Sequence, residues 1–325
     1  MSNKQQENER PPIFSNNPSN IMPQKLTLDS KLKFRCHPGV SCFTACCGNI
    51  NIILTPYDIL RIRRALNLPA EEFLLRYTTP TYLEKTDLPG VKIMLDEEGR
   101  CPFVTPEGCT IYPYRPTTCR YYPVGMSYFR EAPEKKDEKA LAEEFYFLVK
   151  EEHCKGHLED KIQTIQEWRV DQGIDESDLM NKEWMELVMR RKSFGYQATL
   201  SEPAKRIFFL ASTDLDKFRD LVFSDAFLSS YEFDEETLQK LREDDIELMR
   251  FAFRFLAATI FGIRDSGLKV REERLQQKME QIKKHRAGAE KRAQETYQEL
   301  LQDHEKLKKQ AGAKKSAAPG KGSAD

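Results

Sequence analysis

The chain has 325 residues, of which 39% are hydrophobic and 32% charged, so it is long enough for one large domain or two smaller ones with a real hydrophobic core. The formal net charge of −1 excludes a general attraction to nucleic acid or to anionic membranes. The basic clusters at 189–192 and 283–286 lie among acidic residues, so neither nucleic acid nor membrane is expected as a partner.

The start of the chain is polar and rich in Asn, Gln and Pro, and it lacks the apolar run of a secretory signal. The most apolar segment, residues 248–263, contains Arg250 and Arg254 and is shorter than the roughly twenty apolar residues of a membrane span, so it predicts a buried helix. We therefore expect a cytoplasmic protein. There thiols stay reduced, and clustered cysteines favour metal or redox chemistry over disulfides.

The composition changes along the chain, which predicts several parts. All eight cysteines lie in the first half, and in the second half apolar residues recur every three or four positions, as in amphipathic helices. The expected fold class is mainly α, with a small α/β cysteine-rich metal-binding module, a helical C-terminal half and a long charged C-terminal helix. The parts are a disordered N-terminal segment at 1–30, the cysteine-rich metal-binding module at 31–158, a helical domain at 159–266, the long charged helix at 267–311 and a disordered tail at 312–325.

Within the module, two short helices are expected first. Thr55 is a suitable N-cap, Pro56 suits the first helical position, and Asp58 completes a capping-box-like start. Residues 69–77 predict the second helix.

Short strands are expected after these helices. The turn sequences at 96–99 and 105–108 separate short apolar runs, which predicts strands joined by tight turns. Residues 125–130 and 145–150 predict another strand pair around a charged loop.

The second half is expected to be helical and to supply a surface for a protein partner. Its last long stretch, about 270–310, has only a thin apolar seam that is poor in Leu and Ile, which favours an extended, solvated helix over a coiled coil. The shorter helix-like segments are 161–173, 177–192, 202–212, 214–224 and 234–263.

The cysteines form three sets in the sequence and are the candidate metal ligands. Thiolates are soft ligands that serve zinc and iron–sulfur clusters equally well. Cys46 and Cys47 are adjacent, and neighbouring side chains in an extended segment point to opposite sides, so either one faces the core or the two serve different metals. Eight thiols suffice for two four-ligand sites, or for one site with spares. The sets are Cys36, Cys42, Cys46 and Cys47; Cys101, Cys109 and Cys119; and the lone Cys154.

The neighbours of these cysteines suit a charged, shielded centre. Arginines beside the ligands can offset the charge of several thiolates, and aromatic residues can exclude water. The histidines near the cysteines are weaker candidate ligands. The arginines are Arg35, Arg115 and Arg120; the aromatics are Phe34, Phe43, Phe103, Tyr112, Tyr114, Tyr121 and Tyr122; the histidines are His37, His153 and His157.

At these residues the chain resembles the YkgJ-like cysteine-cluster family of zinc- or iron-chelating domain proteins. The resemblance rests on the run that ends in "ACC", on the following "ILTPYDILRI" and on "CPFVTPEGCTIYPYRPTTCRYYP", and it covers roughly residues 34–124. One departure is that the spacing from Cys36 to Cys42 is wider than is usual in the family, so Cys36 is its least secure ligand. The resemblance implies as ligands Cys36, Cys42, Cys46, Cys47, Cys101, Cys109 and Cys119, with Cys154 similar to a further cysteine of longer members.

Three functions are compatible with the sequence. The first is a metal-binding module, with an iron–sulfur or zinc centre that is structural, electron-carrying or sensory. The second is an enzyme such as an S-adenosylmethionine-dependent protein lysine N-methylase, because the flagellin lysine N-methylases carry a similar signature; the chain has neither a C-x3-C-x2-C triplet nor a G-x-G-x-x-G motif. The third is an interaction scaffold held by structural zinc. An iron–sulfur cluster is favoured over zinc, because eight cysteines with an adjacent pair exceed the needs of one zinc ion.

Overall fold

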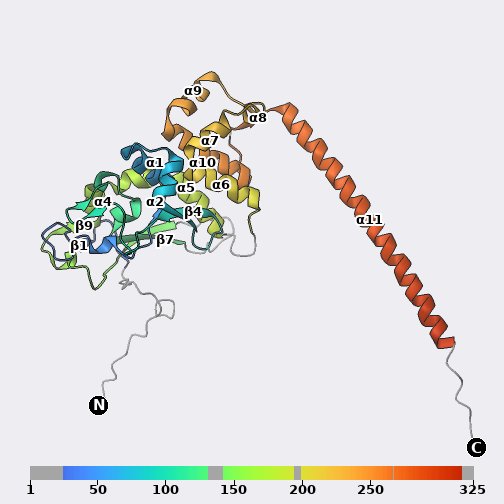
Figure 1. The fold of residues 1–325 in the computed structure, drawn as a ribbon, viewed down its shortest axis with the longest axis horizontal. Coiled ribbons are helices and arrows are strands. Elements are labelled where there is room, and N and C mark those ends of the chain that lie inside the picture. Colours follow the sequence, from blue (N-terminus) through green and yellow to red (C-terminus); the bar gives the residue numbers. More distant parts are fainter. Residues whose placement is uncertain (1–24, 131–141, 194–198, 266, 317–325) are drawn as a thin grey trace, which may run out of the picture. The chain divides into compact units, whose positions relative to one another are not determined.

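The computed structural model describes residues 25–130, 142–193, 199–265 and 267–316, and these residues are mainly helical with small antiparallel sheets of two or three strands (Figure 1). Strands form at 89–93, 104–105 and 108–109, but the predicted turn at 96–99 joins no strand pair among the described residues, because 89–93 pairs with 53–54 and 78–82. The N-terminal residues 1–24, the charged loop at 131–141 and the last residues of the expected tail, 317–325, lie outside the described residues. The described residues form two compact units, one reaching to Ser224 and continuing over Asp234–Gly267, and the other made of Asp225–Phe233 and the chain after Leu268.

The first unit contains both the cysteine-rich segment and the helices that follow it. Strand β1 (Lys31–Lys33) pairs antiparallel with β9 (Ile162–Thr164), so that Leu32 lies opposite Gln163. The two strands lie just before the first cysteine and shortly after the last one, and their pairing brings the two ends of the cysteine-rich segment together.

Helices α1 (Pro56–Ala65) and α2 (Ala70–Tyr77) form where the sequence predicts them. The capping box is present, because the Thr55 hydroxyl accepts a hydrogen bond from the Asp58 amide at 3.1 Å and the Asp58 carboxylate accepts one from the Thr55 amide at 3.0 Å. Beside these helices lies a three-stranded sheet in the order β2-β4-β3, formed by Ile53–Leu54, Pro89–Ile93 and Thr78–Tyr82.

The second part of the cysteine-rich segment consists of two hairpins and short helical turns. The predicted turn at 105–108 joins β5 (Val104–Thr105) to β6 (Gly108–Cys109). The predicted outer strand pair is β7 (Val124–Arg130) with β8 (Ala142–Leu148). Between the hairpins lie η3 (Tyr112–Tyr114) and α3 (Thr117–Tyr121), and η4 (Gly156–Leu158) precedes β9.

Two separate hydrophobic clusters support this segment. One contains Ile59, Ile62, Phe73, Phe103 and Ile111 among its buried members, and it lies between α1, α2 and the β2-β4-β3 sheet. The other includes Leu32, Phe34, Val124, Ile165 and Trp168, and it lies behind β1, β7 and the start of α4.

The helices of the first unit pack around α10 (Asp245–Phe261), which contacts α5, α6, α7 and α9. As the sequence predicts, α10 is buried, with Leu248, Met249, Phe253 and Leu256 at 0–1% exposure. The bounds of the remaining helices are α4 Ile165–Gln172, α5 Ile174–Ser193, α6 Glu202–Thr213, α7 Leu215–Val222 and α9 Glu235–Glu243.

Two helix-like segments differ in detail from the expectation. Residues 162–164 of the first are strand β9, because Leu32 and its neighbours supply backbone partners, and the helix starts only after the Thr164 cap. The segment 234–263 is interrupted at Asp244, whose carboxylate accepts hydrogen bonds from the amides of Ile246 and Glu247 and so begins a new helix.

The second unit contains α8 (Asp225–Leu228), the short pair β10 (Tyr231–Glu232) with β11 (Lys269–Val270), and α11 (Glu272–Ser316). Phe227, Tyr231 and Phe233 form an aromatic cluster, with ring centroids 4.6 Å apart for the first two. Helix α11 is the predicted long charged helix.

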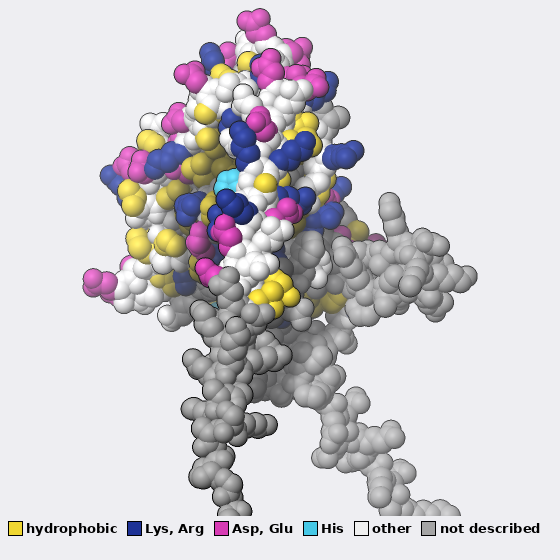
Figure 2. Space-filling view, turned by 90° about the vertical axis from the view of Figure 1, so that its right-hand side faces the viewer, with side chains coloured by type: hydrophobic (Ala, Val, Ile, Leu, Met, Phe, Trp, Pro, Cys, Tyr) yellow, Lys and Arg dark blue, Asp and Glu magenta, His cyan; other side chains and the backbone are white. Residues whose placement is uncertain are grey.

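Charged side chains of both signs are interspersed on the surface drawn in Figure 2, without a field of one sign. A search of the described helices finds none with the length and apolar character needed to cross a bilayer.

Candidate metal centre

Cys42, Cys46 and Cys47 lie in a series of tight turns after β1. Backbone hydrogen bonds run from Val40 to His37, from Phe43 to Val40 and from Ala45 to Cys42, each about one turn long. Thr44 has a left-handed φ of 65°, and the short helix η2 (Ala45–Cys47) follows it. The folding of this stretch back on itself brings Cys42, Cys46 and Cys47 close together.

Contacts with the segment after β8 bring Cys36 and Cys42 next to Cys154. The Arg35 amide donates a hydrogen bond to the Gly156 carbonyl at 3.1 Å, and the Lys155 amide donates one to the Cys42 sulfur at 3.0 Å. Partial desolvation of the thiol, and then the negative charges of Cys46, Cys42 and Cys154, raise the pKa of Cys36 to about 11. We call these four residues the first thiol group: Cys36, Cys42, Cys46 and Cys154.

The other four thiols gather around the β5-β6 hairpin. The Cys101 amide donates a hydrogen bond to the Cys47 carbonyl at 2.8 Å, and Cys109 lies in β6 opposite Val104, whose amide bonds to the Cys101 carbonyl at 3.1 Å. Cys101, Cys109 and Cys119 pack against the same hydrophobic cluster, the one that contains Phe73. We call these residues the second thiol group: Cys47, Cys101, Cys109 and Cys119.

Burial also keeps most thiols of both groups protonated in the absence of metal. It is the largest cause that raises the pKa of Cys119 to about 12, and the charges of Cys101, Asp58, Cys109 and Cys46 add to it. The pKa values of Cys101 and Cys109 are raised by burial as well, although the Arg115 charge lowers that of Cys109.

Cys46 and Cys47 are adjacent in sequence but belong to different groups. The Cys47 thiol donates a hydrogen bond to the Cys46 sulfur, which lowers the pKa of Cys46 to about 7 and raises that of Cys47. Cys46 therefore differs from Cys36, Cys119 and Cys154, whose pKa values are raised.

Asp58 links the second thiol group to α1. Its side chain is 1% exposed, and it accepts hydrogen bonds from the Thr117 amide at 2.9 Å and from the Thr117 hydroxyl at 2.8 Å. Thr117 begins α3, the helix that carries Cys119. The capping-box residue of α1 thus also holds the start of α3, and the sequence pattern at Asp58 indicates only the first of these roles.

The predicted arginines divide into two kinds. Arg115 lies close enough to Cys109 to lower its pKa, as expected of a residue that offsets thiolate charge. Arg120 is buried and donates to three backbone carbonyls, those of Pro113, Arg115 and Gln172. Arg120 therefore holds the η3 turn in place, a role that the sequence does not reveal.

The predicted aromatic residues differ in how far they are buried. Phe34 and Phe103 are 2% and 4% exposed and shield the region as expected, whereas Tyr112 and Tyr114 are 54% and 44% exposed and do not. Tyr122 has an additional role, because its hydroxyl bonds to the Cys154 sulfur and to Glu151, at 3.1 Å for the latter.

The three histidines are engaged with protein groups. His37 contacts Glu159 at 2.9 Å, His153 lies 3.3 Å from Glu151, and His157 lies 3.2 Å from the Val149 carbonyl. Each has a partner other than a thiol group.

Within the described residues, no three His, Cys, Asp or Glu side chains are positioned to hold a metal ion. The thiols of each group are neighbours, and all eight are free. The donor set fits zinc or an iron–sulfur cluster in chemistry and in number, four soft sulfur ligands per group, but the side chains must turn to enclose a metal. The role of the eight cysteines as ligands stays a prediction.

Comparison with known proteins gives one match. Residues 35–155 match the family model CxxCxxCC, which is described as a putative zinc- or iron-chelating domain. The matched range begins one residue before Cys36 and ends one residue after Cys154, so it includes every cysteine of the chain. No curated protein and no solved structure matches the chain.

Proposed function

We propose that the protein binds two metal centres, one in each thiol group; the proposal starts from the match of residues 35–155 to the model of a zinc- or iron-chelating domain. The first thiol group would hold one centre with Cys36, Cys42, Cys46 and Cys154. The second would hold the other with Cys47, Cys101, Cys109 and Cys119.

The observation that carries the proposal is that the other thiols lie on two sides of the hydrogen-bonded pair Cys46 and Cys47. Cys46 and its partners lie beside the contact between Cys42 and Lys155, whereas Cys47 is bonded through its backbone to Cys101. The two sites also adjoin different hydrophobic clusters. Cys154 of the first group packs against the cluster that contains Phe34. Cys101, Cys109 and Cys119 of the second group pack against the cluster that contains Phe73. A single mononuclear site with four spare cysteines would not explain why the eight thiols divide into two groups of four.

We favour iron–sulfur clusters over zinc, with electron transfer or sensing as the role. A bound cluster would supply one-electron redox chemistry, and zinc would supply only structural stabilisation. The residues of this chain would exclude water and set the charge around each centre. Arg115 offsets negative charge beside Cys109, and the Tyr122 hydroxyl lies in hydrogen-bonding contact with the Cys154 sulfur.

The metal content of protein purified without oxygen tests both parts of the proposal. Elemental analysis is expected to show two zinc ions per chain, or iron and acid-labile sulfide in amounts that fit two clusters. A cluster would also absorb near ~400 nm and bleach on reduction. Protein that carries neither iron nor zinc, and takes up neither on reconstitution, would contradict the proposal.

Paired variants test the partition. Cys42→Ser together with Cys154→Ser is expected to remove one centre and to leave the other loaded, and Cys101→Ser together with Cys109→Ser is expected to remove the other. Loss of all metal in both double variants would show that the eight thiols serve one shared centre. An unchanged metal content in either double variant would exclude the corresponding thiol group as a metal site.

The proposed setting is cytoplasmic, where eight free thiols can stay reduced and available to metal. We also propose that the helical C-terminal half contacts a protein partner.

A further inference from the structure

One face of α11 carries apolar side chains that are exposed along its length. Met279, Ile282, Tyr297 and Leu300 are 53%, 49%, 61% and 64% exposed. Exposed apolar residues at a repeat of three and four positions are typical of a helix that packs along another helix. We call this face the α11 seam and define it by Met279, Ile282, Ala289, Ala293, Tyr297 and Leu300.

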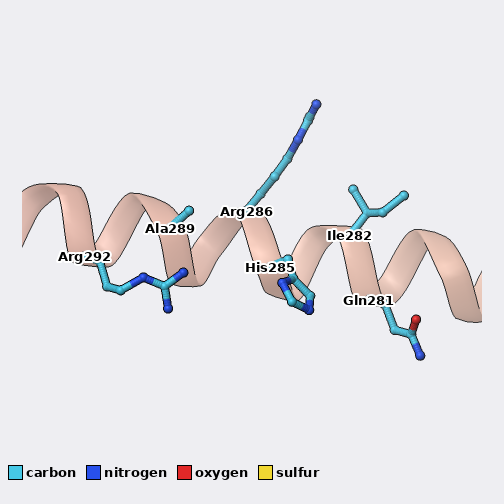
Figure 3. Close-up of a pocket in the computed structure, with 6 residues that line it drawn as sticks. All are labelled: Gln281, Ile282, His285, Arg286, Ala289 and Arg292. Carbon is cyan, nitrogen blue, oxygen red and sulfur yellow. The ribbon is translucent and has the colours of Figure 1, made fainter. Parts of the chain in front are cut away.

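Figure 3 shows the middle of this face. Ile282, Arg286 and Ala289 point to the same side of the helix, whereas Gln281 and His285 point to the other. Arg286 therefore interrupts the seam with a charge, which a partner has to accommodate.

The α11 seam has four of its six residues in pairs that are symmetric about Lys291. Its two alanines lie two residues before and after Lys291, and Ile282 and Leu300 lie nine residues before and after it. Small residues at the centre let two helix backbones approach, and large ones toward the ends fill the space there. A surface with this symmetry is complementary to a second copy of itself that runs in the opposite direction.

The charges favour the same arrangement. The stretch 278–292 contains six Lys or Arg residues and two Glu residues, whereas 294–305 contains four acidic residues and no Lys or Arg. Antiparallel helices that cross at Lys291 place the basic stretch of each copy along the acidic stretch of the other, and parallel helices would place like charges together.

This register also gives Arg286 a partner. Arg286 lies five residues before Lys291 and Tyr297 six residues after it, so the two fall at nearly the same level in opposite copies. A guanidinium against a tyrosine ring is a favourable cation–π contact, which makes the charge in the seam compatible with pairing.

We propose that α11 pairs with α11 of a second copy of this chain, antiparallel, about a two-fold axis near Lys291. The pairing buries the α11 seam, and it is independent of the metal centres.

The oligomeric state of the full chain tests the proposal. Light scattering is expected to give twice the chain mass of 37.8 kDa at micromolar concentration. Ile282→Asp is expected to return the mass to 37.8 kDa, while Gln281→Asp, the same charge change on the opposite side of the helix, keeps the dimer. The fluorescence of Trp168 and Trp184, both buried in the first unit, reports whether the Ile282→Asp variant remains folded.

The orientation is tested with a photoreactive residue, p-benzoylphenylalanine, in place of Ile282. The expected cross-link joins position 282 of one copy to the peptide that contains Leu300 of the other. These positions are about 27 Å apart along one helix, at about 1.5 Å per residue, so the link cannot form within a chain. A monomeric full chain, a dimer that survives Ile282→Asp, or a cross-link between two 282 positions would each overturn the proposal.

Discussion

Asp58 accepts two hydrogen bonds from Thr117, one from the amide and one from the hydroxyl, while it also caps the helix in which it lies. This buried carboxylate connects α1 to α3, and α3 carries Cys119. The second thiol group therefore depends on a residue that is not itself a ligand candidate.

Asp58→Ala is expected to destabilise the protein by about 3 kcal/mol, because it leaves partly buried donors of Thr55 and Thr117 without their acceptor. Urea denaturation measures the loss. Thr117→Val keeps the hydrogen bond from the backbone amide of residue 117 to Asp58 and removes only the one from the hydroxyl. The variant is therefore expected to lose about 1 kcal/mol of unfolding free energy. Equal losses for the two variants would contradict the dual role of Asp58.

Cys46 is expected to be the most reactive thiol of the metal-free protein at neutral pH. Because the Cys47 hydrogen bond lowers the pKa of Cys46 to about 7, its alkylation rate rises with pH to a midpoint near that value. Cys47→Ala removes the donor, so the midpoint is expected to move upward. Mass spectrometry after brief iodoacetamide treatment gives the rates, and preferential labelling of Cys119 would contradict the expectation.

Asp245 contributes to stability through three arginines. It accepts hydrogen bonds from Arg63, Arg64 and Arg219, so Asp245→Asn is expected to cost about 2–4 kcal/mol. Glu236→Gln, in the exposed pair with Lys240, serves as the control and is expected to cost less than about 0.5 kcal/mol.

The contribution of Asp245 should also depend on pH. Although burial opposes ionisation, the hydrogen bonds from Arg219 and Arg64 lower the pKa of Asp245 below its ordinary 3.8. The ionised form therefore stabilises the protein above pH 3.8, and this stabilisation is lost as the pH falls through the lowered value. The difference in unfolding free energy between wild type and Asp245→Asn should shrink as the pH falls over that range. A difference that stays constant would show that the charge of Asp245 is not its cause.

His157 is expected to make the protein less stable in mild acid. Burial against Phe34, at a ring distance of 5.0 Å, lowers the pKa of His157 below its ordinary 6.5. Below pH 6.5 the unfolded chain binds the proton before the folded chain does, so stability falls as the pH falls. His157→Gln should reduce the dependence of the unfolding free energy on pH, measured by urea denaturation with chelator present. Parallel plots of unfolding free energy against pH for wild type and variant would contradict the expectation.

Local signals explain most of what the sequence predicts correctly. The helix start at Thr55, the hairpin turn at 105–108 and the buried α10 depend on residues near one another in the chain. The partition of the thiols depends instead on long-range contacts, such as that between Cys42 and Lys155. The sequence alone does not decide whether Cys46 and Cys47 serve one site or two. The direction of each side chain is set by local turns, and a left-handed residue such as Thr44 has no strong sequence signature.

Interactions across the fold were also beyond prediction. The pairing of Leu32 with Gln163 makes residues 162–164 a strand, although apolar spacing alone favours a helix there. Arg120 lies beside Cys119 in sequence, which suggests a charge role, but its guanidinium is directed to carbonyls that only the folded chain brings near.

The β1–β9 pairing has a consequence for the order of biosynthesis. A chain emerging from the ribosome exposes Cys36, Cys42 and Cys46 long before Thr164 is made, and Lys31–Lys33 has no strand partner until then. During that interval the early thiols face the cellular milieu without the neighbours that later surround them. A metal ion that reached these thiols before Thr164 is synthesised would meet a segment in which β1 and β9 are not yet paired.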